Sequence, residues 1–214
     1  MRLLHEVLAG IGACEESQEW AFDLPEQTSA QEAWQKCPNP LWLMWLLTDM
    51  CSAKVMPAKP VYVATLAMVV EGMRNLPKDE PHAVLRDAVT ALLAWVAKGG
   101  DTDKFAGLRQ DALIEEQMGQ HLERTKPYDA QMRRRSLYVS VTSLLYSASS
   151  SDTVGLYDAA GHAATSITFC CVSTNTEQLT HRMRVADIVR AAVPWAEWEQ
   201  PLMAWAPTRK LIVE

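Results

Sequence analysis

The segment WQKCPNPLWLMWLL, residues 34–47, constrains the fold of this 214-residue chain more than any other. Pro38 and Pro40 interrupt a preceding helix, and Pro40 suits the first turn of a new one, where its missing N–H costs nothing. Residues 41–47 are then all apolar, so a helix here has no polar side. The segment therefore predicts a short helix buried in a core, with other helices packed around it.

Helix signals dominate the rest of the chain. Ser29 and Glu32 have the spacing of a capping box, which predicts a helix from there to about residue 37. Residues 81–98 place apolar side chains at i, i+3, i+4 and i+7, between a proline and a pair of glycines. Further helices are predicted at residues 2–11, 14–22, 58–75, 103–123, 129–148, 153–172 and 177–193.

Strand signals are weak by comparison. The β-branched runs at residues 61–63 and 210–214 lack a hairpin turn or a second alternating run to pair with. A second capping box, Thr174 to Glu177, begins the last predicted helix, and Pro194 should end it. We therefore predict an all-α fold, a bundle of roughly eight to ten helices. The Ala-, Ser- and Gly-rich segments within 136–172 favour close antiparallel helices and suggest stacked hairpins.

The tryptophans gather near the N-terminus. Trp42 and Trp45 are three residues apart and share one face of their helix. With Trp20 and Trp34 from the two preceding helices they would form an aromatic cluster that holds three short helices together. The functional alternative is an aromatic cage or docking face, and burial is favoured because apolar stripes are usually core.

Two domain organisations fit this length. Residues 1–55 form a candidate tryptophan-rich subdomain packed on a helical bundle of residues 56–214, and one continuous domain is the alternative.

Several sequence features indicate the cellular compartment. No apolar run reaches the about 18–20 residues that span a bilayer. His5 and Glu6 interrupt the first apolar stretch, where a signal peptide needs continuity. The five cysteines contain no Cys-x-x-Cys pair. We expect a cytoplasmic protein with reduced thiols.

No motif in the chain supplies a reaction. It has neither a glycine-rich phosphate loop nor a nucleophile elbow. Cys170 and Cys171, with His162 and His181, are the candidate Cys/His metal site, but adjacent helical residues point about 100° apart and no zinc spacing is matched. We expect no catalytic residue, metal or cofactor, and the sequence leans against an enzyme.

The net charge of −6 is unevenly spread. Residues 1–33 hold seven acidic residues against Arg2 alone, including Glu15, Glu16 and Glu19. Residues 124–135 hold a basic cluster of Arg124, Lys126, Arg133, Arg134 and Arg135. Either run is a candidate partner-binding face or merely the solvated side of a helix. The negative net charge disfavours broad nucleic-acid binding.

The pattern GACEESQEWA at 12–21, followed by AQEAWQKCPNPLWLMWLL at 30–47, resembles an N-terminal signature of bacterial and phage proteins. Proteins with this signature are similar to a helical family of immunity proteins from polymorphic toxin systems. The matching residues are Gly12, Ala13, Cys14, Trp20, Ala33, Trp34, Cys37, Trp42 and Trp45. The segment Asn39-Pro40-Leu41 departs from the charged or Asp-Trp start usual for the next helix.

The resemblance implies a protein that docks on a protein partner and neutralises it without turnover. The charge runs make Glu15, Glu16, Glu19 and Arg133–Arg135 the candidate contacts, whereas Cys14, Trp20, Trp34, Cys37, Trp42 and Trp45 are expected to be structural. One alternative is a phage accessory protein that binds a host or defence component. Another is a nucleic-acid binder that uses the 124–135 cluster. No heptad seam is long enough to argue a homo-oligomer.

Overall fold

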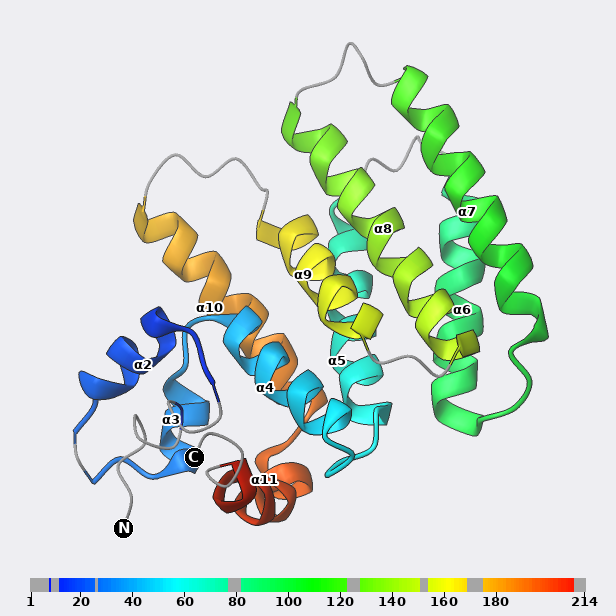
Figure 1. The fold of residues 1–214 in the computed structure, drawn as a ribbon. Coiled ribbons are helices and arrows are strands. Elements are labelled where there is room, and N and C mark those ends of the chain that lie inside the picture. Colours follow the sequence, from blue (N-terminus) through cyan, green and yellow to red (C-terminus); the bar gives the residue numbers. More distant parts are fainter. Residues whose placement is uncertain are drawn as a thin grey trace.

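The computed structural model describes residues 8, 12–25, 27–76, 82–122, 128–150, 154–168 and 175–209. These residues form ten helices and no strand, which confirms the all-α fold (Figure 1). The helices are α2 (Glu15–Phe22), α3 (Ala30–Lys36), α4 (Pro40–Ser52), α5 (Lys59–Arg74), α6 (Ala83–Lys98), α7 (Asp103–Leu122), α8 (Tyr128–Ser150), α9 (Val154–Thr168), α10 (Asn175–Ala192) and α11 (Trp195–Arg209).

Local signals set most of the helix boundaries. The Ser29 hydroxyl accepts from the Glu32 N–H at 3.2 Å, and the Glu32 carboxylate accepts from the Ser29 N–H at 2.9 Å, so the predicted capping box begins α3. The Asn39 side chain accepts from the Leu41 N–H at 3.0 Å, with Pro40 as the first residue of α4. The α6 helix ends at Gly99, whose φ of 71° suits glycine.

Some predicted secondary-structure features lie outside the described residues. Among them are the helix at 2–11 apart from Leu8, the proline at position 81, the capping residue Thr174, and the β-branched run at 210–214. The other β-branched run, residues 61–63, lies inside α5. The described parts of the remaining predicted helices are helical, within a few residues at each end.

No local signal predicts α11. Pro201 and Pro207 lie within it, and a proline removes a backbone donor and crowds the preceding turn. Trp195, Trp198 and Leu202 follow at i, i+3 and i+7 and are all buried. Because α11 packs on α3 and α4, tertiary burial of this stripe offsets the weak local preference.

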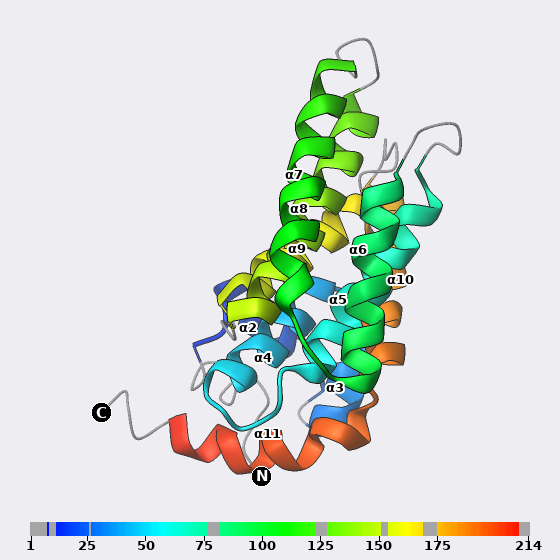
Figure 2. The same cartoon turned by 90° about the vertical axis from the view of Figure 1, so that its right-hand side faces the viewer.

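The bundle is built around α5, α8 and α9. The α8 and α9 helices form an antiparallel hairpin, in which the Ser140 hydroxyl donates to the Ala159 carbonyl at 2.7 Å (Figure 1). The α6 and α7 helices pack beside α8, whereas α4 and α10 pack on α9 (Figures 1 and 2). None of the described helices has the length and apolar character needed to cross a membrane.

One connected cluster of buried side chains extends from Trp34 in α3 to Leu202 in α11. The predicted apolar helix contributes to it, with Leu43, Met44 and Leu47 buried. The division at residue 55 stays a prediction, but α4, which precedes it, packs directly on α9 and α10.

Candidate functional site

Four of the seven acidic residues of the N-terminal run lie on one exposed face of α2 and its carboxyl end. The residues of this face are Glu15, Glu16, Glu19, Phe22 and Asp23, which we call the α2 face, and all five are exposed. Phe22 is the most exposed large apolar residue among those described, at 70%. Because positions i, i+4 and i+7 share a helix face, Glu15 and Glu19 line up with Phe22. The face therefore combines an exposed aromatic ring with four carboxylates.

The opposite side of α2 is fixed to the protein. Ser17 and Ala21 are buried, and the Ser17 hydroxyl donates to the Cys14 carbonyl at 2.8 Å. The Trp20 ring contacts that of Trp42 on α4, with centroids 5.9 Å apart. Hydrogen bonds from its own backbone N–H and from the Cys14 side chain lower the pKa of Glu16. The α2 face is thus a negative surface on a positioned helix.

Three of the signature tryptophans make two separate ring contacts, whereas the sequence predicts a single cluster. Trp20 contacts Trp42, and Trp34 contacts a tryptophan of α11. Trp34 is buried and packs on Trp198 of α11 at 4.3 Å between centroids, and Trp198 contacts Trp195 at 4.4 Å. Trp45 is half-buried against the core. Local spacing could not reveal the role of Trp34, because its partner lies more than 160 residues along the chain.

The two signature cysteines, Cys14 and Cys37, and the neighbouring Cys51 occupy different environments. Cys14 is exposed, whereas Cys37 and Cys51 are buried, and all three are free thiols. Burial raises the pKa of Cys37 to about 11 and that of Cys51 to about 11. These two thiols therefore stay protonated near neutral pH and are unreactive.

The three arginines of α8 differ in exposure and do not form one exposed patch, and their partner-binding role stays a prediction. Arg134 is buried at 6% exposure, and its Nη2 donates to the Glu115 carbonyl at 2.9 Å. Arg133 Nη1 donates to the Asn75 carbonyl at 3.1 Å. Among the three, Arg135 alone is exposed. Arg124 and Lys126, the other members of the cluster, lie outside the described residues.

Arg134 belongs to a buried polar network that joins α6, α7 and α8. Its guanidinium lies 4.8 Å from the centroid of the Tyr138 ring, and the Tyr138 hydroxyl donates to the Glu115 carboxylate at 2.8 Å. His82 Nδ1 lies 3.4 Å from that hydroxyl. Burial and the nearby Arg134 lower the pKa of His82, and burial and Glu115 raise the pKa of Tyr138. With both groups neutral near pH 7, the network joins helices and has no activated nucleophile.

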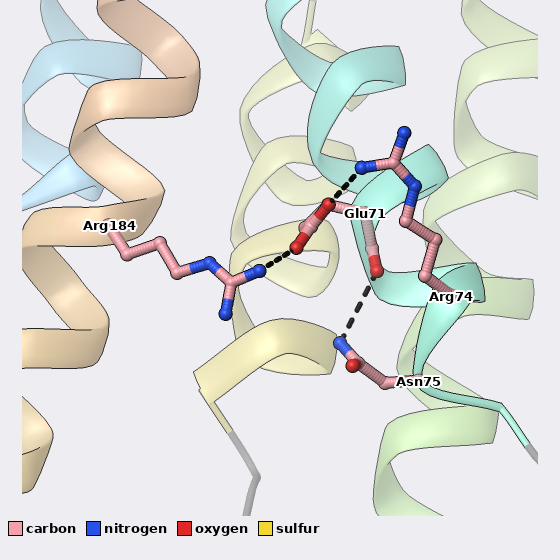
Figure 3. Close-up of polar contacts among 4 residues, drawn as sticks. All are labelled: Glu71, Arg74, Asn75 and Arg184. Carbon is pink, nitrogen blue, oxygen red and sulfur yellow. Dashed lines mark hydrogen bonds and ion pairs between the residues drawn. The ribbon is translucent and has the colours of Figure 1, made fainter.

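A second polar network joins α5 to α10. Glu71, which is 8% exposed, accepts from Arg74 Nη1 at 2.7 Å and also binds Arg184 of α10 (Figure 3). The Asn75 amide donates to the Glu71 carbonyl at 3.3 Å. The i, i+3 spacing of Glu71 and Arg74 is a local signal for a pair, but no sequence signal links either to Arg184.

Metal chemistry finds no support among the described residues, where no three His, Cys, Asp or Glu side chains gather closely enough to hold an ion. Cys170 and Cys171 lie outside the described residues. No family model, curated protein or solved structure matches this chain. Its function must therefore be inferred from its own residues.

Proposed function

We propose that this chain is a non-catalytic binding protein, which docks through the α2 face on a cationic protein and neutralises it, as immunity proteins do with toxins. The observation that carries this proposal is the joint exposure of Phe22 and four carboxylates on an anchored helix. The sequence resemblance to immunity proteins agrees with this role. We also propose that it acts in the cytoplasm, where its free thiols would stay reduced.

Aromatic and charged residues contribute in different ways to a protein–protein interface. A central aromatic side chain that becomes desolvated contributes much of the binding energy. Charges of one sign around it accelerate association with a partner of opposite charge and select against partners of like charge. Because Trp20 and the buried side of α2 already position the helix, docking would lose little conformational entropy.

The basic cluster offers less support for the nucleic-acid alternative. Binding to phosphates requires several exposed cations along one surface. Arg134 is buried, and Arg133 contacts the Asn75 carbonyl, so they do not present such a surface together with Arg135.

The test compares two variants with the same change in net charge. Glu19→Lys with Asp23→Lys replaces two of the four carboxylates with lysines and so removes the net negative charge of the α2 face. Lysines near the carboxyl end of α2 suit its dipole. The control, Asp111→Lys with Asp158→Lys, changes exposed residues on α7 and α9. The partner is first isolated by affinity capture from the native host, and its binding rates are then measured at low salt.

We expect the α2 variant to associate about tenfold or more slowly with the captured protein, and the control variant to retain nearly the wild-type rate. Phe22→Ala should mainly speed dissociation, because it removes a short-range apolar contact. Urea denaturation should show that both charge variants remain folded. Equal rates for the wild-type protein and the α2 variant would refute the proposal.

A further inference from the structure

The α10 helix carries a patch that complements the α2 face in charge. Leu179 and Met183 are 48% and 46% exposed, and their i, i+4 spacing places them side by side. Arg182 and Arg184, both exposed, flank them. We call these four residues the α10 patch. Like the α2 face, it has exposed apolar side chains beside charges of one sign.

The local charge around the α10 patch is positive. Arg184 and Arg74 both pair with the Glu71 carboxylate, and their side chains remain 59% and 72% exposed (Figure 3). Asp187, the acidic residue one turn further along α10, is paired with Arg190 at 2.6 Å. Arg182 adds a further cation. Among the side chains that the structure describes, positive charge therefore exceeds negative charge here, in a chain whose net charge is −6.

We propose that the α10 patch binds the α2 face of a second copy of this chain. Charge complementarity selects this occupant, because the molecule presents Phe22 among carboxylates on one helix and Leu179 and Met183 among arginines on another. The α2 face and the α10 patch belong to different helices, which lie next to each other in the view of Figure 1 and apart in that of Figure 2. The contact is therefore heterologous, joining different surfaces of two copies.

Such a contact is weak and sensitive to salt. Two molecules of net charge −6 repel each other, so attraction between the patches must act at short range. Raising the salt from 0.01 M to 0.15 M shortens the screening distance from about 30 Å to about 8 Å, which weakens exposed charge pairs. Self-association would also cover the α2 face, so it would compete with the partner proposed above. The inference requires only the exposure of that face, not the existence of the partner.

The experiment measures the mass of the purified full chain by sedimentation equilibrium at these two salt concentrations. We expect a weight-average mass above the 23.9 kDa monomer at low salt, which falls towards the monomer at higher salt. Glu19→Lys with Asp23→Lys should weaken association about tenfold. Arg182→Glu with Arg184→Gln should do the same.

A mixture of the two variants is the decisive measurement. The α2 face of the first variant has no net charge, and the second variant has negative charge on both surfaces. The intact α10 patch of the first nevertheless complements the intact α2 face of the second. Mixing them should therefore restore association. The controls Asp111→Lys with Asp158→Lys, and Arg86→Gln with Arg135→Glu, change exposed residues elsewhere by the same charges and should associate like the wild-type protein.

A wild-type protein that stays monomeric at low salt would overturn the inference, as would a mixture that fails to associate although both variants are folded. Association that both variants leave unchanged would also overturn it. Because no other protein is present, each of these outcomes leaves the proposed docking on a cationic partner standing. Conversely, if no cationic partner were found, the mass measured for the purified chain would be unaffected.

Discussion

The carboxylates of α2 and the arginines at the start of α8 are both runs of like-charged residues, but they lie in different environments. Glu15, Glu16 and Glu19 all face solvent, because α2 lies at the edge of the molecule and packs through one side only. The α8 helix is enclosed by α5, α6, α7 and α9. Three consecutive residues on an enclosed helix fan around most of a turn, so at least one must point inward. Here that residue is Arg134, and hydrogen bonding and ring stacking compensate its burial.

The largest effect should come from removing the buried arginine. Arg134→Ala should lower the free energy of unfolding by about 3 kcal/mol, because it removes a buried hydrogen bond and the packing on Tyr138. Arg135→Ala and Glu19→Lys, at exposed positions, should each change it by less than about 0.5 kcal/mol. Urea denaturation followed by circular dichroism checks this. Similar losses for Arg134→Ala and Arg135→Ala would show that the two sites do not differ.

A double-mutant cycle between Arg134 and Gly119 tests whether the buried guanidinium packs against α7. A side chain at Gly119 on α7 would overlap the Arg134 guanidinium, so Gly119→Ala should cost about 1–2 kcal/mol. In the Arg134→Ala background the overlap disappears, and the same change should stabilise α7 by up to about 1 kcal/mol. Additive effects in urea denaturation would place the guanidinium elsewhere.

The smallest effect concerns pH. The folded protein has a lowered pKa at His82, first through burial and then through Arg134, with Arg86 acting the same way and Glu115 opposing it. The unfolded chain therefore binds a proton at higher pH than the folded one, so stability is complete above about pH 6.5 and falls as the pH drops through the folded pKa. Unfolding free energies measured from pH 7.5 to 5.5 should show this decline, and His82→Gln should flatten it. An unchanged slope in that variant would assign the decline to other groups.

Short-range signals account for the helical fold. The capping box at Ser29, the proline at the first turn of α4 and the apolar spacing of α6 each act within one or two turns, so they are legible in the sequence. The exposed carboxylates of the α2 face were also identifiable, because a short helix rich in acids packs through few apolar residues. The α10 patch was not, since nothing local distinguishes an exposed Met183 from a buried one.

What the sequence by itself determined is the helical class, most helix boundaries and the uneven distribution of charge, because these depend on residues that are neighbours along the chain. The tertiary structure alone decided that Trp34 packs on Trp198, that Arg184 reaches Glu71 and that Arg134 is buried. Each of these contacts joins different helices, and Trp198 belongs to a helix that its prolines disfavour locally. Burial of whole helix faces outweighs such local preferences, and it depends on how all the helices pack together.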